Sequence, residues 1–313
     1  MDRAERPSRT AGLGFATGLG LACGLASCGG HQAGGGTPTP AERVGRELTS
    51  VWENDTPELA YGYAENIHDG RGYTSGYVGF CTGTGDAIQV VDCYDKRRSA
   101  AEGNEMSKYV PALVAINDAF EATGQDQGDT SKLDAIGNWV KDWETSATTA
   151  ATRGDFHACQ DQVVTLLYDQ PSVQAAEARG LSTALGRAAL YDTWINQGGV
   201  GGAALAAQTD SALGLKGKIG STITEDAWLK KFLELRLAVL AGDSTWKDSV
   251  DRAAGYEKAR RRGNWALSQP VDSNVKAQTC WPQGTYLDSG YTAWAIAPDG
   301  SYAQIDSGVE GCE

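Results

Sequence analysis

Helical periodicity runs through most of the chain, from residue 41 to about residue 267. Apolar residues recur there at intervals of three and four, the spacing that places them on one face of an α-helix. We find neither an internal repeat nor a run of alternating strands. The chain has 313 residues, 41% of them hydrophobic, which is enough to fill a sizeable core. The sequence therefore predicts a globular, mainly α-helical body.

One apolar stripe predicts a long helix that contains Pro111. The stripe consists of Met106, Tyr109, Val110, Leu113, Ile116 and Phe120. Because proline lacks a backbone N–H and its ring clashes with the preceding turn, Pro111 either bends this helix or marks its true start. The one strand-like stretch of the body is 72–80, GYTSGYVGF, which is aromatic, β-branched and punctuated by glycine. It predicts a small sheet.

Residues 53–86 carry the most specific pattern, ENDTPELAYGYAENIHDGRGYTSGYVGFCTGTGD. It contains, in order, an E-N pair, Y-x-Y-x-E, D-G-R-G-Y-T and G-F-C-x-G-T-G-D. This pattern resembles the catalytic core of glycoside hydrolase family 46, the inverting endo-chitosanases. The resemblance extends over residues 41–270, densely at the front and sparsely behind.

The resemblance implies two helical lobes joined by a long bent helix around a substrate cleft, with the small sheet on one cleft wall. The helix that contains Pro111 fits that long bent helix. The implied activity is endo-acting hydrolysis of β-1,4 links between glucosamine units in chitosan, with inversion and without a cofactor. Inversion requires one carboxyl to donate a proton to the leaving oxygen and a second carboxylate to activate water.

Glu53 and Asp69 are the two candidate carboxylates. Glu53 ends a predicted helix, where the helix dipole disfavours charge, and Trp52 beside it excludes water, so Glu53 suits the general acid. Asp69 opens a turn in which Arg71 and backbone amides hold a carboxylate ionised, so it suits the general base. The resemblance implies that Thr74 positions the attacking water.

Four further residues match positions that contact substrate in the family: Tyr63, Glu65, Arg71 and Asp86. Asp86 also follows Gly-Thr-Gly at a predicted helix start, so it reads as an N-cap as well. Both roles hold together only if its second oxygen faces the cleft. Asp55 and Glu58 match no family position, and either would approach the cleft only if their loop folds differently.

Two charged residues fall on apolar helix faces, Asp192 in LSTALGRAALYDTWI and Arg236 in WLKKFLELRLAVLAG. Burying either one unpaired is costly, so we expect them to pair with each other. The family has such a pair in a network that continues through another arginine toward the catalytic base. Arg252 is the candidate for that position. The pair is either purely structural or tunes Asp69.

The net charge of −13 disfavours nucleic acid and anionic membranes and favours a cationic polymer such as chitosan. Excluding Cys23 in the N-terminal leader and Cys28 just after it leaves five of the 7 cysteines. We expect Cys280 to pair with Cys312 and Cys93 with Cys159, which leaves Cys81 as a buried free thiol. The 3 histidines form no cluster in the sequence, so we expect no metal site.

Residues 1–27 have three arginines followed by a short apolar stretch, which predicts a signal peptide. Small residues before Cys28 resemble the lipobox of bacterial lipoproteins, in which that cysteine is lipidated. The alternative is ordinary cleavage with Cys28 unmodified. Residues 28–40 read as a flexible tether. We therefore expect an extracellular monomer held at the outer face of the membrane only by a lipid anchor on Cys28.

The composition changes in the tail, 271–313, which is rich in Gly, Ser and aromatic residues. Stretches 291–296 and 302–305 flank Pro298-Asp299-Gly300, which predicts a hairpin. The tail, beyond the resemblance, is either a structural cap or a small polysaccharide-binding surface. For the chain as a whole, two other functions remain open: a lysozyme-like hydrolase of peptidoglycan or chitin, and a non-catalytic carbohydrate-binding lipoprotein.

Overall fold

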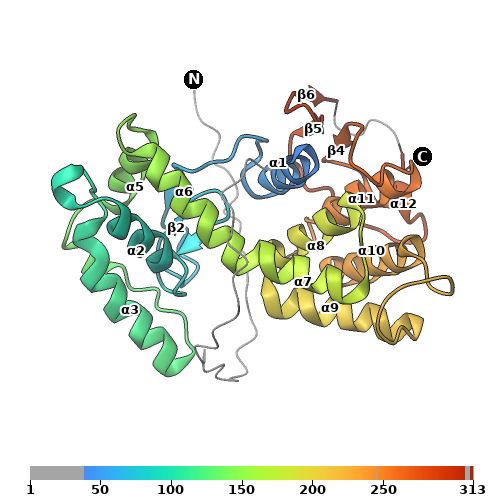
Figure 1. Ribbon diagram of the computed structural model, residues 1–313, viewed down its shortest axis with the longest axis horizontal. Helices are drawn as coiled ribbons and strands as arrows, with labels where there is room; N and C mark the ends of the chain where they lie inside the picture. Colours follow the sequence, from blue (N-terminus) through green and yellow to red (C-terminus); the bar gives the residue numbers. More distant parts are fainter. Residues whose placement is uncertain (1–38, 245, 307–310, 313) are drawn as a thin grey trace.

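The computed structural model describes residues 39–244, 246–306 and 311–312. These residues form two helical lobes, one at the left and one at the right of Figure 1, connected by a helical segment that crosses between them. Within these ranges, none of the helices combines the length and the apolar character needed to cross a bilayer. The predicted leader, Cys28 and nearly all of the predicted tether lie outside the described residues.

The first lobe combines a small sheet with a layer of helices. Its strands pair antiparallel in the order β1-β2-β3, with Glu65 opposite Thr74 and Thr74 opposite Cys81. The core of the lobe includes the aromatic rings of Trp139, Trp143 and Phe156, which pack in tilted and edge-on contacts. The elements are β1 (Ala64–Glu65), β2 (Thr74–Ser75), β3 (Phe80–Cys81), α2 (Ala87–Arg97), η1 (Ala100–Glu102), η2 (Ser107–Tyr109), α3 (Val110–Thr123), α4 (Ser131–Asp134), α5 (Trp139–Thr148) and α6 (Arg153–Val164).

The second lobe is built from both ends of the described chain. Helix α1 packs on α8, and α8 also packs on α9 and α11, around a core that includes Trp52, Trp228 and Phe232. The elements are α1 (Pro40–Asn54), α7 (Gln170–Arg179), α8 (Ala184–Asn196), α9 (Gly198–Leu213), α10 (Glu225–Gly242), α11 (Asp251–Arg261), β4 (Val271–Asp272), α12 (Ala277–Cys280), β5 (Ala293–Ile296) and β6 (Tyr302–Ile305).

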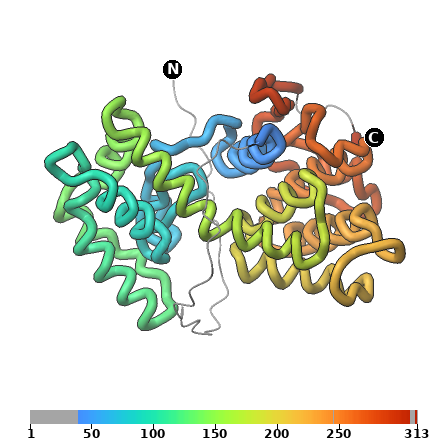
Figure 2. The backbone as a smooth tube through the Cα atoms, viewed as in Figure 1, coloured from blue at the N-terminus to red at the C-terminus, as the bar shows by residue number. Residues whose placement is uncertain are grey.

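The segment between the lobes is a continuous helix with a π-helical turn. It runs from α6 through η3, the π-helical Thr165–Asp169, into α7, which has Pro171 in its first turn. Figures 1 and 2 show this segment changing direction where it passes from one lobe to the other. The prediction that the Pro111 helix is the long bent helix is therefore wrong. Pro111 lies in the first turn of α3, a helix of the first lobe, and marks its start.

Helix α1 ends beside Glu53, as the sequence predicts. Thr39 and Glu42 form a capping box at its start, and Pro40 occupies the first helical position, where its missing N–H costs nothing. The buried face includes Val44, Leu48, Val51 and Trp52. The C-cap of the helix is Asp55, whose φ of 59° lies in the left-handed region that Asp tolerates better than most residues. This ending fixes where Glu53 emerges.

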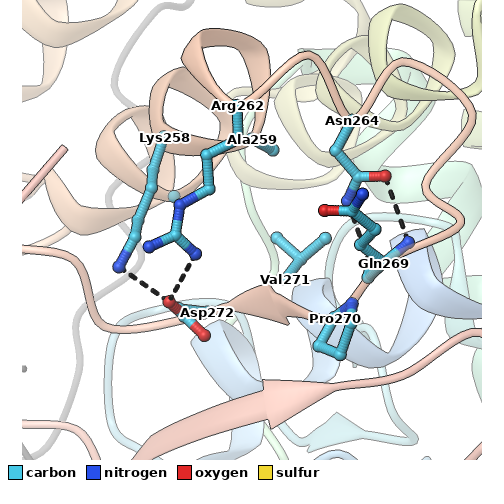
Figure 3. A pocket seen from close by; sticks show the side chains of 9 residues that line it. Lys258, Ala259, Arg262, Asn264, Gln269, Pro270, Val271 and Asp272 are labelled. Carbon is cyan, nitrogen blue, oxygen red and sulfur yellow. Dashed lines mark hydrogen bonds and ion pairs between the residues drawn. The ribbon is translucent and has the colours of Figure 1, made fainter. Parts of the chain in front are cut away.

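The C-terminal hairpin forms as predicted. Strands β5 and β6 pair antiparallel, and β5 also pairs with β4. A small pocket beside β4 is bordered by Asp272, which pairs with Lys258 at 2.8 Å and with Arg262 at 3.9 Å (Figure 3). None of the candidate catalytic residues lines this pocket. These ion pairs tie the first strand of the extension to α11.

Both predicted disulfides are present. Cys93–Cys159 joins α2 to α6 in the first lobe, and Cys280–Cys312 joins α12 to the last described residues. Cys81 is a buried free thiol, also as predicted. Each lobe therefore contains its own disulfide.

Candidate active site

Glu53 lies in the last turn of α1, and its carboxylate is one quarter exposed. Arg252 from α11 donates to its Oε1 at 2.5 Å. The same Nη2 group donates to the backbone carbonyl of Trp52 at 3.0 Å. No hydrogen bond to Oε2 occurs among the residues that the structure describes. Glu53 therefore has one oxygen engaged by an arginine and one available to a ligand.

Behind Glu53 lies a chain of buried charges. Asp192 Oδ2 accepts from Arg236 at 2.6 Å, and Asp192 Oδ1 accepts from Arg252 at 3.1 Å and from Thr49 at 3.0 Å. The exposed side-chain fractions are 0% for Asp192 and Arg236 and 2% for Arg252. Burial acts to lower the pKa of Arg252, but Glu53 and Asp192 outweigh it, so the net shift is upward. Arg252 therefore stays charged.

The predicted pair of Asp192 and Arg236 is confirmed. The expected continuation of this network toward the candidate base is wrong, because Arg252 connects Asp192 to Glu53, the candidate acid. Asp69 is paired with a different arginine. The sequence could not distinguish these targets because 199 positions separate Arg252 from Glu53.

Asp69 lies in the first lobe, in the turn before β2, and its side chain is 5% exposed. Arg71 donates to Asp69 Oδ2 through Nε at 2.8 Å and Nη2 at 2.5 Å, and its backbone N–H donates to Oδ1 at 3.0 Å. Glycines at 70 and 72 have positive φ, and a Cβ on Gly72 would collide with Thr82 Oγ1. The D-G-R-G pattern thus folds into a turn that aligns Asp69 with Arg71.

Thr74, on β2, lies beside Cys81 of the neighbouring strand, with Oγ1 and Sγ 3.6 Å apart. Burial raises the pKa of the Cys81 thiol to about 12, so it stays protonated. The charges of Asp86, Arg71 and Asp69 also affect the pKa of the Cys81 thiol. These charged groups and Cys81 therefore form one electrostatic cluster beside Thr74. The first lobe therefore gathers the candidate base, its arginine and the candidate water-positioning hydroxyl.

Asp86 is the N-cap of α2, as one of its two predicted roles requires. Its Oδ1 accepts from Ala87 N–H at 3.0 Å, Cys81 N–H at 2.9 Å and Thr84 Oγ1 at 2.8 Å. Burial raises its pKa, and these hydrogen bonds act in the opposite direction. In the described part of the chain, Oδ2 makes no hydrogen bond. The second oxygen thus remains open for a ligand.

Tyr63 and Glu65 lie at β1, with Tyr63 Oη donating to Glu65 Oε2 at 3.1 Å on the surface. Tyr61, the first tyrosine of the Y-x-Y-x-E pattern, has a different position. Its hydroxyl donates to Asp161 at 2.8 Å, and its ring stacks on His157 with 3.8 Å between centroids. Tyr61 therefore fastens the motif to α6, while Tyr63 and Glu65 present polar groups outward.

The two acids that match no family position are both engaged by the C-terminal extension. Asp55 accepts from the backbone N–H of Thr292 at 2.8 Å, and Glu58 accepts from the Tyr302 hydroxyl at 2.9 Å. Among the described residues, no arginine holds either of them in the way that Arg252 holds Glu53 and Arg71 holds Asp69. This difference separates the candidate pair from its neighbours in sequence.

Tyr168 lies near candidate residues of both lobes, and sequence reasoning missed it. It lies in the π-helical turn between the lobes and packs against the cores of both. Burial raises its pKa, and the nearby charges of Asp86 and Glu53 add to the shift. Tyr168 is thus within electrostatic reach of both lobes' candidate groups. Its sequence surroundings, LLYDQP, carry no periodic signal that could have revealed this.

The arrangement provides acid–base chemistry. Two carboxylates are carried by different lobes, and each has an arginine that fixes one or both oxygens. No group of three or more His, Cys, Asp or Glu side chains in the described ranges is arranged to hold a metal ion. A carboxyl pair with distinct surroundings is what hydrolysis of a glycosidic bond requires.

The chain is similar to known proteins over most of its length. The sequence model of "Glycosyl hydrolase family 46" matches residues 47–271. A chitosanase of Bacillus subtilis (strain 168) is 35% identical over 240 residues, which cover 74% of this chain and 80% of that protein.

Solved structures are similar as well. A mutant chitosanase from Bacillus subtilis MY002, complexed with 6 GlcN, is 34% identical, with a TM-score of 0.62 over 76% of this chain and 95% of that one. A family 46 chitosanase of Gynuella sunshinyii, in complex with chitotetraose, is 27% identical, with a TM-score of 0.64 over 87% and 99%. The chain therefore belongs to glycosyl hydrolase family 46.

Proposed function

We propose that this protein is an endo-acting, inverting chitosanase in which Glu53 is the general acid and Asp69 the general base. The observation that carries the proposal is the placement of these two carboxylates. They are on different lobes, Glu53 anchored by Arg252 and Asp69 by Arg71. The helical segment between the lobes packs against the cores of both lobes. A polymer lying between the lobes would pass between an acid and a base.

Glu53 would supply the proton that the leaving oxygen needs. Arg252 holds Oε1, so Oε2 is the oxygen that carries the proton and transfers it to the glycosidic oxygen as the bond to the anomeric carbon breaks. The buried Asp192 and Arg236 hold Arg252 in place from behind. This network keeps the orientation of the acid fixed between turnovers.

Asp69 would take the proton of the attacking water. Arg71 donates to both of its oxygens, yet each carboxylate oxygen has a further lone pair to accept from water. Thr74 Oγ1 is the hydroxyl we assign to hold that water. The water oxygen bonds to the anomeric carbon from the face opposite the leaving group, which inverts the configuration.

The substrate class follows from charge and from the relatives. A net charge of −13 attracts a polycation and raises its encounter rate at low salt. Tyr63, Glu65, Arg71 and the free Oδ2 of Asp86 are the groups we assign to sugar hydroxyls and ammonium groups. Of the two similar structures described above, one is a complex with 6 GlcN and the other a complex with chitotetraose.

The test is hydrolysis of chitosan samples of graded acetylation by the wild type, Glu53→Gln and Asp69→Asn. We expect each variant to lose about 10²- to 10⁴-fold in rate, the usual contribution of a general acid or base. Glu58→Gln is the matched control, because Glu58 bonds Tyr302 at the rim and should leave the rate unchanged. Nuclear magnetic resonance of the first product should show the α anomer from a β linkage.

Full activity in Glu53→Gln or Asp69→Asn would overturn the assignment of these residues. Faster release of reducing sugar from peptidoglycan or chitin than from chitosan would favour the lysozyme-like alternative. Absence of turnover by the wild type on all three polymers would favour a binding protein.

For the location of the enzyme, we propose export and lipidation at Cys28. The leader sequence and the two disulfides, which persist in oxidising compartments, support this. Metabolic labelling with a radioactive fatty acid should label the wild type and not Cys28→Ser. Equal labelling of both would refute the anchor.

A further inference from the structure

The segment 289–292, which precedes β5, contacts residues on both sides of the Glu53–Arg252 ion pair. It follows the last residue that the family model matches, residue 271. Its side chains and backbone reach the end of α1, which carries Glu53, and the start of α11, which carries Arg252. No role in the reaction follows from the family match for a segment in this position.

On the Glu53 side, Tyr291 Oη donates to the backbone carbonyl of Trp52 at 2.7 Å. The last carbonyls of a helix have no partner within the helix and need one from outside. Thr292 also holds the helix end, with its backbone N–H 2.8 Å from Asp55 Oδ1 and its Oγ1 3.3 Å from Oδ2. Trp52 and Asp55, which flank Glu53 and Asn54, are thus both hydrogen-bonded to the extension.

On the Arg252 side, Ser289 Oγ donates to Asp251 Oδ2 at 3.1 Å. Asp251 is the first residue of α11, it is 3% exposed, and it directly precedes Arg252 in the chain. Arg252 itself shares the Trp52 carbonyl with Tyr291. The same short segment therefore sets the position of one helix end relative to the other.

We propose that Tyr291 and Thr292 are positioning residues for the general acid. They act through Trp52 and Asp55 to keep Glu53 Oε2 directed at the substrate while Arg252 holds Oε1. This inference rests on the proposed role of Glu53 as general acid. It assigns the C-terminal extension a part in the reaction, through orientation of a catalytic group and not through contact with the substrate.

The central experiment compares Tyr291→Phe with Tyr302→Phe in the full chain. Both changes remove one hydroxyl, and both hydroxyls belong to the extension and bond an acceptor in or after α1. We expect Tyr291→Phe to lower kcat about 5-fold, the worth of one hydrogen bond, with KM unchanged because ground-state binding is not altered. Tyr302→Phe should retain wild-type kcat and KM.

A second pair of variants addresses Asp55, whose left-handed φ of 59° Asn and Gly also tolerate. Asp55→Asn keeps an oxygen for the Thr292 N–H and should keep kcat within about 2-fold of the wild type. Asp55→Gly relieves backbone strain but removes that acceptor, and it should lower kcat with KM unchanged. Rescue by Asn and not by Gly identifies the contact with Thr292 as the cause.

Wild-type kcat in Tyr291→Phe, or an equal loss in Tyr302→Phe, would overturn the inference. So would a fall in kcat that is explained entirely by a smaller folded fraction, measured by near-ultraviolet circular dichroism at the assay temperature. The proposed function is tested separately by Glu53→Gln. If Glu53→Gln is inactive and Tyr291→Phe is fully active, the positioning role fails while the catalytic assignment stands.

Discussion

Replacing Asp192 with Asn tests whether the buried charge network determines the stability of the second lobe. Asp192 accepts from Arg236, Arg252 and Thr49, and its side chain is fully buried. Asn keeps the size of the side chain but removes the charge. It also places an NH₂ group where one carboxylate oxygen now accepts, so at least one donor is left facing another donor.

The expected cost follows from what remains around the two arginines. Arg252 keeps Glu53, whereas for Arg236 the described residues offer no second acidic partner, and its Nε and Nη1 already lack hydrogen-bond partners. Breaking a buried ion pair by removing one partner costs about 3–5 kcal/mol. We therefore expect the free energy of unfolding to fall by about 4 kcal/mol and the melting temperature by about 10 °C.

The matched control is Asp92→Asn, the same substitution in an exposed ion pair. Lys96 Nζ lies 2.5 Å from Asp92 Oδ2, but the two side chains are 72% and 46% exposed. Such a pair contributes about 0–1 kcal/mol, so this variant should unfold almost as the wild type does. Urea denaturation followed by circular dichroism gives both free energies.

Equal stability of Asp192→Asn and Asp92→Asn would refute the reasoning, because burial would then have no effect on the value of the pair. The same variant addresses the role of the network in the reaction. An unchanged pH–rate profile, measured where Asp192→Asn is fully folded, would identify the network as structural. A displaced profile would show that the network acts on Glu53.

Two further predictions concern titratable groups of the first lobe. Burial lowers the pKa of His157, so on lowering the pH the unfolded chain binds a proton before the folded chain does, and the free energy of unfolding should fall below about pH 6.5. Urea denaturation should show that the free energy of unfolding of His157→Gln depends less on pH than that of the wild type. The same pH dependence in both proteins would contradict this prediction. Cys81 has a pKa raised by burial to about 12 and is 1% exposed, so it should react with iodoacetamide at pH 8 only after unfolding in guanidinium. Peptide mass spectrometry locates the label. Rapid labelling of Cys81 in the native protein would contradict this prediction.

The sequence predicted those features that depend on the local spacing of apolar residues, or on charged residues that interrupt this spacing. Helix α1 was predicted because its apolar residues repeat with helical period up to Trp52. The pairing of Asp192 with Arg236 was predicted because both charges interrupt apolar faces, where an unpaired charge is costly. The hairpin around Pro298-Asp299-Gly300 was predicted from turn chemistry between two strand-like stretches.

The features that could not be predicted depend on contacts between distant parts of the chain. A π-helical turn such as Thr165–Asp169 has no distinctive residue spacing, so the segment between the lobes and Tyr168 within it went unrecognised. Pro171 lies in the first turn of α7, where proline is tolerated, so the helical segment continues past it. The partner of Arg252 depends on how α11 packs beside α1, which no local pattern encodes.

The sequence distance between contacting residues differs between the two lobes. Residues 64–164 contain the whole β1-β2-β3 sheet and the helices around it, so the first lobe can form from one continuous stretch of chain. The surroundings of Glu53 need residues that are far away in the sequence, since Arg252 follows it by 199 positions and Tyr291 follows Trp52 by 239. A chain truncated before residue 252 could therefore form the first lobe, but it would lack the arginine that fixes the carboxylate of the candidate acid.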